Sequence, residues 1–141
     1  MMDQLIEKFK NYRKGKYLGL TYQHQYAFVG IGSHSLQNLY PVIQYLGIPL
    51  KYIVTRSKEN AAKVDKRFPG ITGTNDLETV LNDKEVKGIF ICAHPKAHYQ
   101  LVKKALENDK WVFVEKPPCT NSDELNDLIS SEAKGQGSCL V

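Results

Sequence analysis

The stretch from Tyr26 to Pro41 constrains the fold more than any other part of this chain. It opens with a short apolar run that carries no charge, and this run ends at two glycines one residue apart, Gly30 and Gly32. Apolar residues at helical spacing follow, namely Leu36, Leu39, Tyr40, Ile43 and Leu46. A strand, a glycine turn and a helix in this order predict a turn where backbone N–H groups can approach a pyrophosphate, because glycine has no Cβ in the way.

The glycine pattern departs from the full dinucleotide-binding fingerprint at its third glycine, where this chain has Ser35. A serine is small enough for the close helix–strand packing that the third glycine serves. The hydroxyls of Ser33 and Ser35 can bond a phosphate or cap the helix, and His34 can reach a phosphate. The alternative for this segment is a tight turn that binds nothing.

Composition bounds the class of protein. The 141 residues suit one domain, with 42% hydrophobic and 24% charged residues and a net charge of +4. No apolar run is long enough to cross a bilayer, and the lysine-rich start does not resemble a signal peptide, so we expect a cytoplasmic protein that binds neither membrane nor nucleic acid. The three cysteines form no C-x-x-C pair, which argues against a disulfide framework or a metal site.

Strand-like and helix-like segments alternate along the chain. Strands are expected near residues 27–31, 50–54, 71–72, 87–93, 111–114 and 138–141, and helices after the glycine turn and near 58–68, 76–81, 97–108 and 122–134. This alternation predicts an α/β fold: a Rossmann-type doubly wound parallel sheet in three α/β/α layers. Residues 3–14 predict an amphipathic N-terminal helix. We therefore divide the chain into a helix and connector at 1–25 and a nucleotide-binding domain at 26–141.

The loops after the strands are expected to meet at the carboxyl edge of the sheet, where such folds bind ligands. Thr55, Arg56 and Ser57 follow the second strand, at the place where an NAD-binding chain carries a carboxylate for the ribose hydroxyl. An arginine between hydroxyls suits a 2′-phosphate instead, so NADP is favoured over NAD. The alternative is that Arg56 stacks on the adenine or lies in solvent.

Four segments together resemble the N-terminal domain of the Gfo/Idh/MocA oxidoreductases. They are V-G-I-G-S-H-S after the first strand, D-L-E-T-V-L-N-D-K-E-V-K-G-I-F-I, A-H-P-K-A-H-Y, and V-F-V-E-K-P-P after the fifth. The last is the most specific, because Glu-Lys-Pro between an apolar strand and a helix is the hallmark of that family.

The resemblance implies roles for particular residues. Lys116 is expected beside the nicotinamide as the catalytic residue, with a pKa that burial can lower into a useful range, and Glu115 is expected at the nicotinamide ribose. Pro117 fixes the loop, and its bond to Lys116 is a candidate for the cis form. Cofactor contacts are also expected from the loop after the fourth strand, at Ala93, His94, Pro95 and His98. This loop departs from the family's Thr-Pro-Asn pattern, and the histidine at 98 has a structural alternative.

The resemblance also implies what the chain does. It is expected to be the NAD(P)-binding part of an oxidoreductase that moves a hydride between the nicotinamide and a sugar, a cyclitol or a sugar-derived acid. We find no counterpart here of the family's substrate domain, so we expect a truncated chain that is inactive alone and self-associates through its open sheet face. The alternatives are a non-catalytic dinucleotide-binding regulator and a nucleotide or acyl-CoA-binding domain. Glu-Lys-Pro argues against both.

Overall fold

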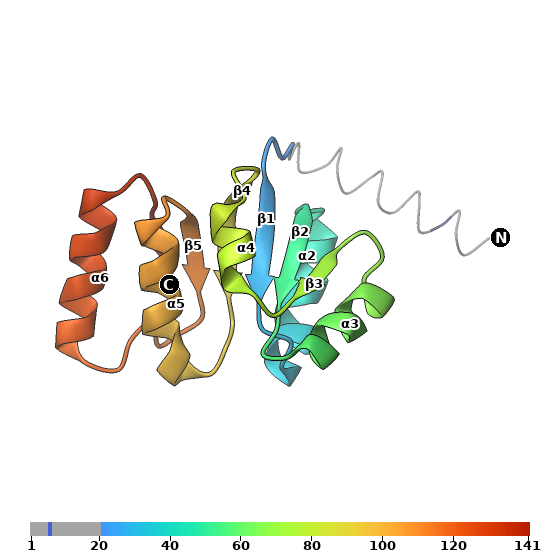
Figure 1. Ribbon diagram of the computed structural model, residues 1–141, viewed down its shortest axis with the longest axis horizontal. Coiled ribbons are helices and arrows are strands. Elements are labelled where there is room, and N and C mark those ends of the chain that lie inside the picture. Colours follow the sequence, from blue (N-terminus) through green and yellow to red (C-terminus); the bar gives the residue numbers. More distant parts are fainter. Residues whose placement is uncertain (1–5, 7–20) are drawn as a thin grey trace.

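The computed structural model describes residue 6 and residues 21–141, and its elements alternate between strand and helix (Figure 1). The expected N-terminal helix lies outside the described residues except for residue 6. In chain order the elements are β1 Gln25–Val29, η1 Ser35–Leu39, α2 Tyr40–Leu46, β2 Leu50–Val54, α3 Lys58–Arg67, β3 Thr72–Thr74, α4 Leu77–Asn82, β4 Val86–Ile91, α5 Pro95–Glu107, β5 Trp111–Val114, α6 Ser122–Lys134 and β6 Cys139–Leu140.

The strands form one sheet in the order β3-β2-β1-β4-β5-β6, and every neighbouring pair is parallel. Starting from β1 at the centre, the chain adds β2 and β3 on one side of the sheet. It then crosses back to add β4, β5 and β6 on the other side. This confirms the Rossmann-type fold. The order reverses between β1 and β4, and ligands in such sheets bind at the carboxyl ends of the strands on either side of that point.

The core has two parts, one on each face of the sheet. On one face, Phe28 and Ile53 pack with Tyr40 and Ile43 of α2 and Val64 of α3. On the other face, apolar side chains of the strands pack against α4, α5 and α6. The strands alternate their side chains between these faces, and Phe28, Ile53, Ile89 and Ile91 are fully or almost fully buried. Burial on both faces explains why the sequence reads as uninterrupted apolar runs there.

Several boundaries differ from the sequence prediction. β1 begins two residues earlier than predicted, at Gln25, and ends before Ile31, because Gly30 takes a φ of +112° that leaves the extended region. β3 lies at Thr72–Thr74 instead of 71–72. Glycine usually weakens a strand, but at Gly73 it lets β3 pass beside α3: an added Cβ would lie 2.1 Å from the carbonyl oxygen of Ala61.

Two other boundaries shift for local reasons at the fourth strand. β4 ends at Ile91 instead of residue 93, and α5 begins at Pro95 instead of residue 97. Proline suits the first helical position because its fixed φ is helical and its missing N–H would have no partner there. His94 caps this helix, with its Nδ1 accepting a hydrogen bond from the amide of Lys96.

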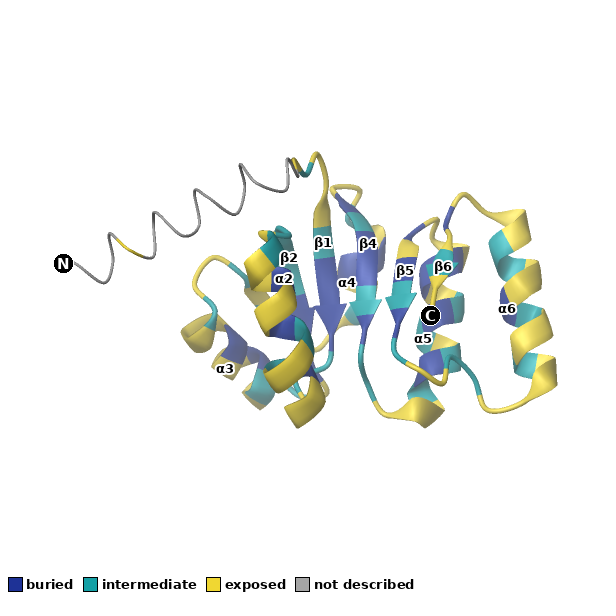
Figure 2. Cartoon of the chain, turned by 180° about the vertical axis from the view of Figure 1, so that it is seen from behind, coloured by how far each residue is buried: buried dark blue, intermediate teal, exposed yellow. Residues whose placement is uncertain are grey.

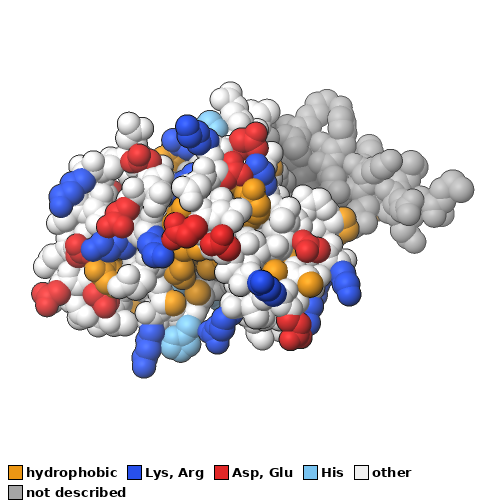
Figure 3. Space-filling view, viewed as in Figure 1, with side chains coloured by type: hydrophobic (Ala, Val, Ile, Leu, Met, Phe, Trp, Pro, Cys, Tyr) orange, Lys and Arg blue, Asp and Glu red, His pale blue; other side chains and the backbone are white. Residues whose placement is uncertain are grey.

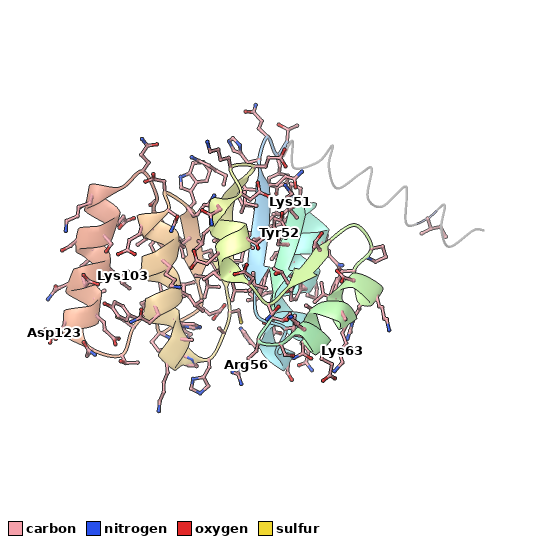
Figure 4. All side chains as sticks on the ribbon, in the orientation of Figure 1. Lys51, Tyr52, Arg56, Lys63, Lys103 and Asp123 are labelled. Atoms are coloured by element: carbon pink, nitrogen blue, oxygen red, sulfur yellow. The ribbon has the colours of Figure 1, made fainter. Side chains whose placement is uncertain are left out.

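A network of charges joins the loop before β4 to its neighbours at the amino edge of the sheet. Lys51 on β2 lies 2.6 Å from the carboxylates of both Asp83 and Glu85, and the hydroxyl of Tyr52 donates to Asp83 (Figure 4). The buried Lys110 donates two hydrogen bonds of 2.8 Å to the carbonyl oxygens of Asp83 and Val86. These contacts tie the loop before β4 to β2 and to Lys110, the residue before β5.

We predict that Asp83 gives the fold an acid-dependent stability. Hydrogen bonds from Lys51, the Glu85 amide and Tyr52 lower the pKa of Asp83 from 3.8 to about 2. Because the pKa is lower in the folded state, the contribution is present above about pH 4 and is lost as the pH falls toward 2. Asp83→Asn should lower the free energy of unfolding in urea by about 1–2 kcal/mol at pH 7, with water screening part of the full shift.

The control for this prediction is Glu107→Gln, because Glu107 is exposed and forms no ion pair with the residues that the structure describes. The difference between wild type and Asp83→Asn should shrink between pH 4 and pH 2.5, while Glu107→Gln stays close to wild type. A difference that is constant over this range would contradict the role given to the Asp83 carboxylate.

Among the residues that the structure describes, no helix covers one half of one sheet face. Figure 2 looks onto the face that α2 and α3 cover over β1, β2 and β3, and β4, β5 and β6 lie open beside them. Its exposed surface is lined mainly by aromatic and aliphatic side chains: Tyr26, Phe90, Trp111, Phe113 and Leu140. Trp111 is 42% exposed and Leu140 is 65% exposed. Single exposed apolar side chains are common on protein surfaces, but a contiguous apolar patch such as this one favours association with another protein molecule.

Self-association stays a prediction, and this open half-face is where we expect a second copy to bind. Trp111→Lys should shift the chain toward the monomer in sedimentation velocity, because a charge there must stay in water. Tyr45→Lys supplies the control, since Tyr45 is exposed on α2, outside the residues that line the open half-face. A wild-type chain that remains monomeric at high micromolar concentration would refute the prediction.

Candidate functional site

A groove of about 780 Å³ lies at the carboxyl edge of the sheet, across the point where the strand order reverses. Residues after β1, β2, β3 and β4 line it, so it draws on both halves of the fold. Its volume is within the range of small-molecule and cofactor sites. In the space-filling view, Lys, Arg and His side chains gather along this lower edge (Figure 3).

Gly30 and Gly32 both line the groove, but the surroundings of their Cα atoms differ. At Gly30 an added Cβ would lie 2.0 Å from the carbonyl oxygen of Cys92, and its φ of +112° is one that other residues rarely adopt. The protein itself therefore requires this glycine. At Gly32 an added Cβ would meet no atom within 4 Å, although the residue lines the groove. Nothing in the fold requires the second glycine, so the space that it leaves is available to a ligand.

The helix after this turn contains a π-helical turn, η1, between its first residues and α2. Pro41 has no N–H to continue the regular bonding pattern, and the amide of Tyr40 bonds the carbonyl of Ser35 five residues back. Tyr40 is buried, and its hydroxyl donates to the carbonyl oxygen of Gly30 over 3.0 Å. Burial raises the pKa of Tyr40, so this hydroxyl stays protonated and holds the glycine turn.

Ser35 occupies the third glycine position of the fingerprint and is fully buried. Its hydroxyl donates to the carbonyl oxygen of Cys92 over 3.4 Å. The side chain thus ties the helix to the end of β4, which is the packing role that a glycine would serve through its small size. The amides of Ser33 and His34 lie at the start of this helix, where backbone N–H groups have no intrahelical partner.

The loop after β2 presents Arg56 to the groove and uses its two hydroxyls for structure. The hydroxyl of Thr55 donates to the carbonyl oxygen of Ser57 over 2.9 Å. Ser57 caps α3, accepting a hydrogen bond from the amide of Asn60. Arg56 is exposed, lies at the lower edge of the sheet in Figure 4, and pairs with no carboxylate in the part of the chain that the structure describes. A guanidinium in this setting is available to an anion.

His98 is buried at 1% exposure and joins the loops after β4 and β5. Its Nδ1 lies 2.8 Å from the carbonyl oxygen of Pro117, and its Nε2 lies 3.0 Å from the carbonyl oxygen and 3.3 Å from the amide nitrogen of Ala93. The Lys116–Pro117 bond is cis, as the sequence suggested. His98 thus holds the loop that carries Lys116, and Lys116 itself is exposed.

Glu115 follows β5 and reaches back toward the glycine turn. Its carboxylate Oε1 lies 3.6 Å from Nε2 of His34, which lines the groove. Asn38, one turn further along the helix, lies 2.9 Å from Nδ1 of His34. The side chain of His34 thus stands between the helix and the β5 loop.

The structure brings most of the sequence-predicted residues to this groove but not all of them. Those that line it are Gly30, Gly32, Ser33, His34, Ser35, Thr55, Arg56, Ala93 and His94. Ser57, Pro95, His98, Glu115, Lys116 and Pro117 do not line it, although Glu115 contacts His34, which does.

Two polar residues of the groove escaped the sequence analysis, Asn60 on α3 and Asn75 after β3. Asn75 could have been found if β3 had been placed correctly, because it follows that strand at the carboxyl edge. Among residue 6 and residues 21–141, no three His, Cys, Asp or Glu side chains form a candidate metal site. Over the same residues, no helix has the length and apolarity to cross a membrane.

Comparison with known proteins agrees with this geometry. The chain matches the model of the Gfo/Idh/MocA oxidoreductase family with an NAD-binding Rossmann fold over residues 24–141. It is 35% identical over 114 residues to the oxidoreductase YhhX of Escherichia coli (strain K12), which covers 79% of this chain and 32% of that protein. It is 30% identical over 104 residues to the inositol 2-dehydrogenase/D-chiro-inositol 3-dehydrogenase of Lactiplantibacillus plantarum, covering 74% of this chain and 29% of that enzyme.

A solved structure has the same fold at lower sequence identity. The 3-ketoreductase KijD10 of Actinomadura kijaniata, in complex with TDP-benzene and NADP, superimposes with a TM-score of 0.71 at 18% identity, covering 80% of this chain and 36% of that one. The chain spans about a third of the length of the curated relatives that it matches. The match over residues 24–141 shows that the chain belongs to the Gfo/Idh/MocA oxidoreductase family, and the parallel sheet with a glycine turn at its switch point agrees with it.

Proposed function

We propose that this chain binds a nicotinamide dinucleotide in the groove and is the cofactor-binding part of an oxidoreductase acting on a sugar, a cyclitol or a sugar-derived acid. The observation that carries the proposal is Gly32, whose missing side chain leaves space that the fold does not use. A pyrophosphate lying there contacts the amides at the start of the helix that begins at Ser33.

The residues around the groove fit the two ends of such a cofactor. On the β2 side, Arg56, Asn60 and Asn75 offer a guanidinium and two amides for an adenosine ribose and its 2′-phosphate. On the β4 side, Ala93 and His94 line the wall toward the β5 loop. The exposed arginine and the absence of a carboxylate from 55–57 favour NADP, and the KijD10 neighbour was solved with NADP.

Lys116 is our candidate for the catalytic residue. It follows β5 on the loop that His98 holds, beside Glu115, which approaches the groove through His34. The cofactor supplies the hydride chemistry, and an amine here serves by moving a proton at the reacting carbon of the substrate. The inositol dehydrogenase among the named relatives supports a cyclitol or a related polyol as substrate. Because the groove is open to solvent, we propose that this chain alone binds cofactor without turnover.

Substituting each glycine in turn separates their two roles. Gly30→Ala should destabilise the fold by about 2–4 kcal/mol in urea unfolding, because its Cβ collides with the Cys92 carbonyl. Gly32→Ala should leave the stability within about 0.5 kcal/mol and weaken NADPH and NADH binding by roughly tenfold or more. If Gly32→Ala binds both cofactors as wild type does, the pyrophosphate does not lie at this turn.

Arg56→Ala tests the choice of cofactor by isothermal titration calorimetry. We expect wild type to bind NADPH more tightly than NADH, and Arg56→Ala to weaken NADPH by roughly tenfold while NADH changes less than about twofold. Arg67→Ala is the matched control, since Arg67 is an exposed arginine at the far end of α3. A wild-type preference for NADH would keep dinucleotide binding and overturn the choice of NADP.

A further inference from the structure

His34, at the start of the helix after β1, and Glu115, in the loop after β5, are 81 positions apart in the sequence and meet beside the groove. The side-chain nitrogen Nδ2 of Asn38 donates a hydrogen bond to Nδ1 of His34 over 2.9 Å. Because Nδ1 accepts this bond, the ring proton is on Nε2, which is the nitrogen 3.6 Å from the Glu115 carboxylate. Asn38 thus orients His34, and His34 directs its N–H toward Glu115.

The position of Glu115 in the fold places it beside one half of the groove, where it contacts the groove-lining His34. Arg56 and Asn60 lie on the β2 side of the point where the strand order reverses, and Glu115 follows β5 on the other side. Each half of such a sheet takes one mononucleotide of a dinucleotide. With the adenosine phosphate at Arg56, the nicotinamide falls in the half of the groove that Glu115 borders.

A carboxylate in that half distinguishes the two oxidation states of the cofactor by charge. The oxidised nicotinamide ring carries a positive charge and the reduced ring carries none, while the rest of the molecule is unchanged. Glu115 is partly buried, with its side chain 24% exposed, so its field is screened less than that of a surface carboxylate. Within the described residues no Lys or Arg forms an ion pair with it. The other titratable groups on these loops are Lys116, which is exposed, His94 and the thiols of Cys92 and Cys119.

We propose that Glu115, positioned by His34, makes this site favour the oxidised over the reduced nicotinamide dinucleotide. The inference rests on the proposed function, because it requires the cofactor to lie in the groove. His34 is a positioning residue here, and Glu115 is the group that acts on the cofactor charge.

The test measures the dissociation constants of NADP⁺ and NADPH for the whole 141-residue chain by calorimetry at one fixed pH, and compares their ratio between variants. Glu115→Gln should lower the preference for NADP⁺ by roughly three- to tenfold, since it removes the charge and keeps the shape. Glu107→Gln is the matched control: it removes one exposed carboxylate at the end of α5 away from the groove, and should leave the ratio unchanged.

Two variants test the part of His34. His34→Leu removes the N–H that faces Glu115 and should lower the ratio in the same direction by a smaller factor. His34→Gln keeps an N–H donor and should restore most of the wild-type ratio. A loss of packing alone would weaken both oxidation states together and leave their ratio unchanged, so the ratio separates positioning from damage to the fold.

The outcomes distinguish the inference from the proposed function. If wild type binds both forms and Glu115→Gln has the wild-type ratio, or weakens both forms equally, this inference is wrong and cofactor binding stands. If His34→Leu has the wild-type ratio or a higher one, His34 does not position Glu115. If wild type binds neither form, the proposed function fails and the inference fails with it.

Discussion

The approach of β1 to β4 at Gly30 is the constraint on which the site depends. The backbone of Gly30 lies so close to the carbonyl of Cys92 that no side chain fits between them. The Tyr40 hydroxyl bonds the Gly30 carbonyl on one side, and Ser35 bonds the Cys92 carbonyl on the other. These contacts fix the turn after β1 against the end of β4, and so fix where the following helix begins. The groove opens where the sheet order reverses because these two strands separate their outgoing loops there.

The two edges of the sheet differ in how their charged side chains are paired. At the amino edge, charged side chains satisfy one another: Lys51 pairs with Asp83 and Glu85, and Lys110 bonds two backbone carbonyls. At the carboxyl edge, the exposed Arg56 has no carboxylate partner among the described residues, although the surrounding hydroxyls are engaged in the loop. The ion pairs of Lys51 thus serve the fold at the amino edge. The carboxyl edge keeps polar groups available, as parallel α/β sheets do where they bind ligands.

The loops after β4 and β5 are held by a side chain that does not line the groove. His98 is buried and contacts both loops, so the positions of Glu115 and Lys116 depend on α5 as well as on β5. His34 and Asn38 reach the same region from the helix after β1. The candidate site is therefore built from both halves of the fold.

The fold class can be read from the sequence, because apolar runs and helical periods alternate with turn residues and each of these signals is local. The sequence also determined the glycine turn, the helix bounds of α6 and the place of Arg56 after β2. It did not determine that β3 contains Gly73, because only the neighbouring α3 shows why a glycine is needed there. The meeting of His34 with Glu115, the burial of His98 and the presence of Asn60 and Asn75 in the groove were decided by tertiary structure alone. Each depends on residues that are distant in the chain, and a periodic pattern records which face of an element is apolar but not which distant loop that element meets.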